Sequence, residues 1–99
     1  MSQTIWKAVV KREANAFGVY AVELPEGATL LSTGVQNGAI VVWALVDPRY
    51  PTTRHLIYVA GTGQEQRFGG HWRFLGTVFQ GLFVWHVFDM NEIEEAMPR

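Results

Sequence analysis

One six-residue pattern, which begins with Val-Trp and ends with Asp, occurs twice in this chain of 99 residues. Residues 42–47 (VWALVD) return as residues 84–89 (VWHVFD). Each copy follows a turn dipeptide, Asn-Gly at 37–38 and Gln-Gly at 80–81. A turn dipeptide before an apolar run is typical of the second arm of a β-hairpin. Because both faces of each arm are mostly apolar, the two phrases predict a packed antiparallel β core.

Turn residues divide the rest of the chain into further short apolar segments, and no segment of ten residues shows a helical period. The predicted strands cover residues 4–10, 17–24, 29–35, 39–47, 55–60, 72–79 and 82–89. This pattern predicts an all-β fold of about seven strands, either a small antiparallel sandwich or a partly open barrel. We expect one domain over residues 1–89. Residues 90–99 are acidic and predict a flexible tail, either disordered or one exposed helical turn.

The core residues are predicted from the two-sided apolar strands and from the large side chains within them. The residues expected to be largely buried are Trp43, Trp85, Val42, Leu45, Val84, Val87, Leu56 and Phe83.

Composition makes several classes of function improbable. The chain has no cysteine, so disulfides and thiolate metal sites are ruled out. The net charge is −1 and the basic residues are scattered, which disfavours a nucleic-acid binder. The longest apolar run, residues 39–46, is far shorter than the roughly 20 residues of a membrane helix. The N-terminus lacks a signal-peptide pattern, so we expect no membrane partner and a cytoplasmic protein.

Catalytic candidates are few. The histidines His55, His71 and His86 lack the close spacing of a zinc site, so no metal site is expected. His86, between apolar neighbours, is interpreted as a hydrogen-bonded core histidine. Asp47 and Asp89 end matching strands; they could converge as a catalytic pair, but an aspartate before proline more often begins a turn. No complete set of acid, base and nucleophile is present, which predicts a non-enzymatic protein without a cofactor.

The longest irregular segment, residues 61–71, begins with Gly-Thr-Gly and is rich in residue types that bind ligands or proteins. It lacks the Lys-Ser/Thr of a phosphate-binding loop. With its flanks it supplies the predicted binding residues Arg54, Gln64, Arg67, Phe68, His71, Trp72 and Arg73. If the fold gathers them, they form a positive rim for an acidic partner or a phosphate. The alternative is that they are ordinary solvated charges on β edges.

The first predicted strand carries apolar side chains, a single charge and no proline. Such a strand is weakly protected against pairing with another chain. Ile5, Trp6 and Val9 are therefore predicted as interface residues of a homodimer. The alternative is that this strand pairs within its own chain and closes a monomeric barrel.

The order of several phrases resembles an uncharacterised family of short β proteins encoded by bacteriophages and prophages. The matching pieces are residues 24–28 (LPEGA), 35–38 (VQNG), 42–48 (VWALVDP), 61–63 (GTG), 75–78 (LGTV) and 83–88 (FVWHVF). The resemblance implies a phage accessory protein in the host cytoplasm and implies no activity, cofactor or catalytic residue. Many family members place a histidine directly after Gly-Thr-Gly, where this chain has Gln64.

Three hypotheses about function follow. The first is a non-enzymatic accessory protein that binds a host or phage protein, and in one form inhibits it, because interface-anchoring residue types are abundant. The second is a small-molecule or nucleotide-binding β domain that uses the loop at 61–71. The third is a minor structural component of a virion.

Overall fold

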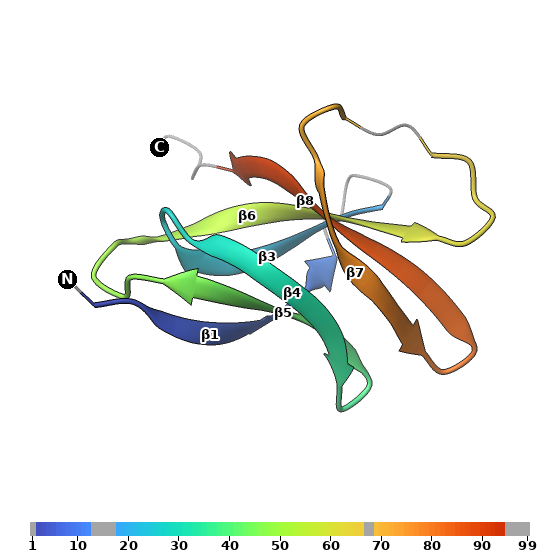
Figure 1. Cartoon of the computed structure of the whole chain (residues 1–99), viewed down its shortest axis with the longest axis horizontal. Coiled ribbons are helices and arrows are strands. Elements are labelled where there is room, and N and C mark those ends of the chain that lie inside the picture. Colours follow the sequence, from blue (N-terminus) through green and yellow to red (C-terminus); the bar gives the residue numbers. More distant parts are fainter. Residues whose placement is uncertain (1, 13–17, 67–68, 95–99) are drawn as a thin grey trace.

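The computed structural model describes residues 2–12, 18–66 and 69–94, which form strands and turns (Figure 1). The strands are β1 (Thr4–Val9), β2 (Lys11–Arg12), β3 (Val19–Pro25), β4 (Thr29–Gln36), β5 (Ala39–Val46), β6 (Thr52–Gly61), β7 (Arg73–Gln80) and β8 (Phe83–Glu94). Seven of these have six or more residues, and β2 has two. Among the described residues, a helix with the length and apolarity needed to span a bilayer is absent.

The strands form two antiparallel sheets. One has the order β1-β5-β4 and the other the order β2-β3-β6-β8-β7. The chain passes between the sheets at Val10, after β1, where the Val10 N–H donates to the carbonyl oxygen of Ile40 at 2.9 Å. The all-β prediction is confirmed, and of its two forms the sheets adopt the sandwich and do not close into a barrel.

The core lies between the two sheets, where alternate residues of each strand point inward. Its buried members are Val22, Leu24, Leu30, Ile40, Val42, Ala44, Val46, Ile57, Val59, Val78 and Val87. The predicted core residues Val42 and Val87 are fully buried, each at 0% exposure. Leu56, Val84 and Trp85 are half-buried, and Trp85 packs against the edge of this core.

Two of the predicted core positions are wrong, one because of its place along the hairpin and one because of the face on which it lies. Phe83 is 61% exposed, at the end of its hairpin. Trp43 alternates with the core residues Val42 and Ala44, so it lies on the outer face of the three-stranded sheet, half-buried. Its ring covers Gly34, where an added Cβ would lie 2.9 Å from the ring.

The same alternation explains Leu45, which is half-buried on that outer face. A strand that is apolar on both faces carries no alternation in its sequence, so the inward face could not be identified from it.

The predicted tail begins too early in the chain, because β8 continues past residue 89 to Glu94. Met90 is buried, at 7% exposure. The extension is possible because β6 begins at Thr52, earlier than predicted, and supplies the pairing partners for residues 93 and 94. Part of the predicted tail is thus a strand of the five-stranded sheet. Residues 95–99 lie outside the described residues.

Candidate functional site: an uncharged aromatic hairpin

The hairpin of β7 and β8 has a tight turn, Gly81-Leu82, between the paired residues Gln80 and Phe83. Gly81 has a φ of +59°, whereas Leu82 does not have a positive φ. A positive φ at only the first central residue is the type II′ arrangement, which favours glycine there and matches the twist of the strands. The turn therefore fixes the register of the hairpin and presents Leu82 at its tip.

Four large apolar side chains of this hairpin are exposed to solvent. The exposed fractions are 54% for Phe74, 70% for Phe79, 100% for Leu82 and 61% for Phe83. Phe79, Leu82 and Phe83 lie around the turn, with Phe79 and Phe83 on opposite faces of the hairpin, and Phe74 lies five residues from Phe79 along β7. We call these four residues the hairpin surface. Large exposed apolar groups that lie close together are uncommon on monomeric proteins and often mark interaction sites.

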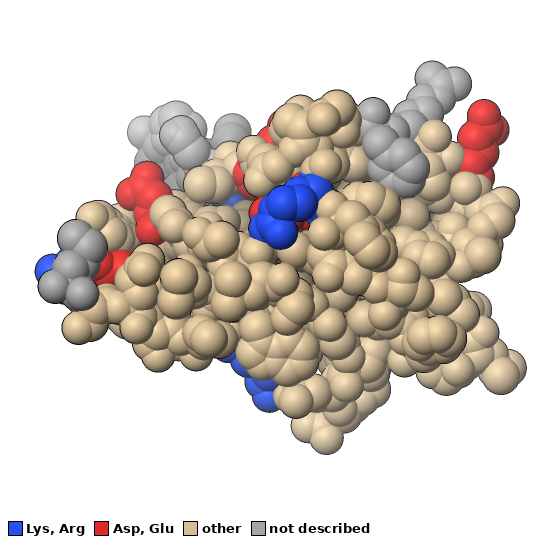
Figure 2. All heavy atoms as spheres, in the orientation of Figure 1, with Lys and Arg blue, Asp and Glu red and all other residues tan. Residues whose placement is uncertain are grey.

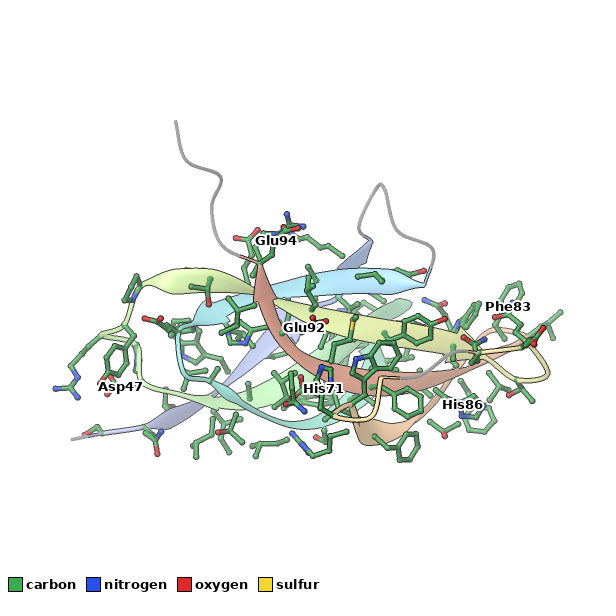
Figure 3. The ribbon with its side chains drawn as sticks, turned by 90° about the horizontal axis from the view of Figure 1, so that it is seen from above. Asp47, His71, Phe83, His86, Glu92 and Glu94 are labelled. Carbon is green, nitrogen blue, oxygen red and sulfur yellow. The ribbon has the colours of Figure 1, made fainter. Side chains whose placement is uncertain are left out.

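No charged residue occurs between Phe74 and Phe88, a stretch that contains the whole hairpin surface. In the space-filling view, the lower right part of the molecule, where Figure 1 places the turn between β7 and β8, has no blue or red atoms on the visible face, and red atoms lie above it at the same end (Figure 2). Figure 3 shows Phe83 and His86 toward this end of the long axis and Asp47 at the other. Charges are depleted at the centres of protein interfaces, so this composition suits a binding surface.

Hydrogen bonds behind the tip tie the hairpin to the other sheet. The Trp85 indole Nε1–H donates to Gln80 Oε1 at 3.0 Å, and Gln80 Nε2 donates to the carbonyl oxygen of Gly38 at 2.8 Å. Phe83 stacks on Trp85, with ring centroids 5.5 Å apart and planes inclined by 20°. These contacts hold the tip in one conformation, which lowers the entropy lost on binding.

His86 lies on the outer face of the hairpin, between two threonines. Its Nε2 is 2.6 Å from Thr62 Oγ1 and its Nδ1 is 3.0 Å from Thr77 Oγ1. A hydroxyl can donate or accept, so both ring nitrogens have a partner in either tautomer. The prediction of a hydrogen-bonded histidine is confirmed, but the residue is half-buried on the outer face and is not part of the core.

Further aromatic rings flank this histidine on the same sheet. Phe74 contacts Phe88 with a centroid distance of 5.3 Å, and Tyr58 stacks on Trp72 at 4.9 Å. Trp72, a predicted binding residue, is thus half-buried against β6. The outer face of β6, β7 and β8 carries aromatic rings around a polar group, Thr62–His86–Thr77, whose side chains bond to one another.

The predicted positive rim is not gathered into one site. Arg54 lies opposite Glu94 in the β6–β8 pairing and forms an ion pair with it. Gln64 is bonded to Gly61 at the far end of β6, seven residues of strand from Arg54, or about 23 Å at 3.3 Å per residue. Arg67 and Phe68 lie outside the described residues, so their role stays a prediction.

The remaining rim residues bond within the protein. Arg73 Nη2 lies 3.5 Å from Asp89 Oδ2 and also donates to the carbonyl oxygen of Leu30 in the other sheet. His71 is exposed, and its carbonyl oxygen accepts a hydrogen bond from Asn91 Nδ2. Arg73 thus bonds within the protein, at the β7 edge of the five-stranded sheet.

The Gly-Thr-Gly segment forms a closed turn. Gln64 N–H donates to the carbonyl oxygen of Gly61 at 3.3 Å, and the Gln64 side chain accepts from Gly61 N–H at 3.1 Å. Thr62 is held by His86. A phosphate-binding loop needs free backbone N–H groups, and the N–H of Gly61 is already bonded.

The two strand-end aspartates do not converge, because Asp47 follows β5 and Asp89 belongs to β8 in the other sheet. Asp47 begins a turn, as predicted: it accepts from the Arg49 backbone at 3.1 Å and from the Arg49 guanidinium at 2.7 Å. These side-chain hydrogen bonds hold the pKa of Asp47 below its ordinary value. A shallow hollow of about 400 Å³ beside this pair is lined by Ser2, Asp47, Pro48 and Arg49.

His55 is the one buried histidine of the described residues, at 7% exposure. Its Nε2 lies 3.1 Å from Thr53 Oγ1. Burial lowers the pKa of His55, because the charged form loses its hydration. Within the described part of the chain, no three His, Asp or Glu side chains are grouped to hold a metal ion.

Comparison with protein-family models gives a match. A family model described as a domain of unknown function (DUF7352) covers residues 1–97. Neither a curated protein nor a solved structure matches the chain.

Proposed function

This chain belongs to the family described as a domain of unknown function (DUF7352), and we propose that it is a non-enzymatic binding module whose contact site is the hairpin surface. The observation that carries the proposal is the exposure of Phe74, Phe79, Leu82 and Phe83 within a stretch that has no charge. Phenylalanine and leucine at a rigid convex tip suit an apolar groove on another protein.

The hairpin surface can supply a specific interaction. Full burial of a leucine or phenylalanine side chain contributes about 1.5–3 kcal/mol. Three such side chains lie at the tip. After the entropy cost of association is subtracted, their burial free energy is enough for an interface dominated by a few anchor residues. The backbone there is already paired and the tip is tied to the sandwich, so little ordering is needed when the partner binds.

The partner that we propose is a protein of the host or of a phage, as the resemblance of the sequence phrases to phage proteins suggests. A lipid surface is disfavoured because proteins that bind membranes by an apolar tip usually add lysine or arginine beside it, and this hairpin has neither between Phe74 and Phe88. A module of this kind acts by occupying an apolar groove of its partner. It inhibits the partner when that groove is required for the partner's own activity.

The test is photo-cross-linking in cells that naturally contain the protein. A photoreactive phenylalanine analogue replaces Leu82 or Phe79, and the matched controls carry it at Leu31 or Tyr50, which are 43% and 48% exposed on other elements. We expect one adduct of defined mass from the hairpin positions, reduced by competing wild-type protein, and none from the controls. Equal adducts at all four positions would refute the proposed site. The absence of a protein adduct, together with binding of the purified protein to neutral lipid vesicles, would also refute it.

A further inference from the structure

Four strands lie at edges: β1 and β4 in one sheet, β2 and β7 in the other. Exposed edges invite pairing with another chain, and proteins protect them with bulges, very short strands, prolines or charges. The β4 edge is interrupted between Leu30 and Ser32, and the β7 edge between Phe74 and Gly76. The strand β2 has only two residues.

The strand β1 has only one of these protections, a single charge. It pairs with β5 in unbroken register from Thr4 to Val9, and it contains no proline. Its one charge, Lys7, is directed across the sheet, where the ammonium group donates to Gln36 Oε1 at 2.7 Å. Among the described residues, no strand pairs with the other edge of β1.

The apolar side chains of β1 are exposed although one edge of the strand is fully paired. Ile5 is 59%, Trp6 40% and Val9 46% exposed. They lie on both faces, because Trp6 pairs with the core residue Ala44 while Ile5 and Val9 pair with outer-face residues. A strand laid beside β1 would shield both faces at once, which a partner on a single face would not do.

The direction of the free backbone groups follows from the pairing. The N–H of Val10 donates to Ile40, so the even-numbered residues direct their backbone groups toward β5. The odd-numbered residues Ile5, Lys7 and Val9 therefore direct N–H and C=O groups toward the free edge. These three residues supply the donors and acceptors for an added strand.

We propose that this added strand is β1 of a second copy, related by a two-fold axis through Trp6. A two-fold antiparallel pair must join residues on the same face, so the registers centred on the strand are Trp6 with Trp6 of the partner subunit or Lys7 with Lys7 of the partner subunit. The second opposes two like charges, which is unfavourable. The first opposes two aromatic rings and places Ile5 beside the partner's Lys7, without any like-charge pair.

The expected affinity follows from the size of the contact. A strand of six residues offers an edge of about 20 Å, and edge pairing alone falls below the roughly 1,600 Å² of a standard interface. The dimer is therefore expected at micromolar concentrations. In Figure 1, β1 and the turn between β7 and β8 lie toward opposite ends of the long axis, so the dimer leaves both hairpins free. If the proposed function holds, such a dimer is bivalent.

Sedimentation equilibrium of the full chain at about 1–200 μM tests the pairing without any binding partner, so its outcome is separate from that of the hairpin. We expect the mass to rise from 11.2 kDa toward twice that value. Lys7→Pro removes one outward N–H and leaves the β1–β5 ladder intact, so it should weaken the dimer at least tenfold. A mass of 11.2 kDa at every concentration overturns the proposal, and so does a Lys7→Pro protein that dimerises normally.

A second measurement uses the absence of cysteine from the chain. Trp6→Cys places a single thiol on the axis, where the Cα atoms of a non-hydrogen-bonded pair lie about 4.5 Å apart, within disulfide range. Val9→Cys, the matched control, places its thiols about six residues apart in the paired strands, or about 20 Å. Mild oxidation should link Trp6→Cys and leave Val9→Cys monomeric. Linkage of Val9→Cys at the same rate would contradict the register.

Discussion

Replacing Ile57 with alanine tests the sandwich core at its centre. Ile57 is fully buried, and it lies on β6 between Tyr20 of β3 and Asp89 of β8. The change removes three methyl or methylene groups, which at about 0.8 kcal/mol each cost about 2.4 kcal/mol. A residual cavity of about 50 Å³, at about 24 cal/mol per Å³, adds about 1.2 kcal/mol. The expected loss of unfolding free energy is therefore about 3.6 kcal/mol.

The assay is urea denaturation followed by tryptophan fluorescence, with thermal denaturation followed by circular dichroism as a second readout. For a domain of this length, about 4–8 °C of Tm is lost per kcal/mol, so Ile57→Ala should melt about 14–29 °C lower than wild type. The matched control is Ile93→Ala, because Ile93 is 45% exposed and should lose only about 1 kcal/mol. Equal losses at the two positions would refute the assignment of the core.

Three further predictions concern the surface, the pH dependence and the packing of Trp43. The triple variant Phe79→Thr, Leu82→Ser and Phe83→Thr should lose only about 0.5–1.5 kcal/mol, mainly the stacking of Phe83 on Trp85, and a loss above 3 kcal/mol in urea denaturation would show that these residues are structural. Burial lowers the pKa of His55, so its contribution to stability is complete above the unfolded pKa of about 6.5 and is lost as the pH falls below it. Thermal denaturation between pH 7.5 and 5 should show this loss as a falling Tm in wild type and in His71→Gln, and as a smaller fall in His55→Gln. The same dependence of Tm on pH in His55→Gln as in wild type would contradict this prediction. Gly34→Ala places a Cβ 2.9 Å from the Trp43 ring and should cost about 1–3 kcal/mol, whereas Gly70→Ala, which meets nothing within 4 Å, should not; equal stabilities in urea would contradict the packing of that ring.

The fold was predictable from the sequence where local chemistry determines it. Asn37 and Gly38 have φ values of +51° and +79°, the conformation that an Asn-Gly hairpin turn requires, and the predicted hairpin forms there. The end of β8 was not predictable in this way. Its acidic composition indicates a tail, and only pairing with a distant part of the chain, residues 54 and 55 of β6, makes it a strand.

The candidate site was predicted less well than the fold. The predicted residues cluster in the sequence around the loop at 61–71, but β6 carries Arg54 and Gln64 to opposite ends of the sheet. The hairpin surface had a signal in the sequence, because no charge occurs from Phe74 to Phe88. The absence of charge does not locate the exposed side chains, because an apolar strand gives no indication of which face meets solvent. Only the position of the second sheet distinguishes Val87, which is buried, from Phe79, which is exposed.

The most direct test of the central claim is the affinity of wild type and variants for the protein that the hairpin cross-link identifies, measured by isothermal titration calorimetry. The triple variant at Phe79, Leu82 and Phe83 should bind at least about 100-fold more weakly, or about 2.7 kcal/mol. Leu31→Ser, an exposed apolar position on β4, should bind within about threefold of wild type, a change of under about 1 kcal/mol. An unchanged affinity for the triple variant, or an equal loss for Leu31→Ser, would contradict the assignment of the hairpin as the binding surface.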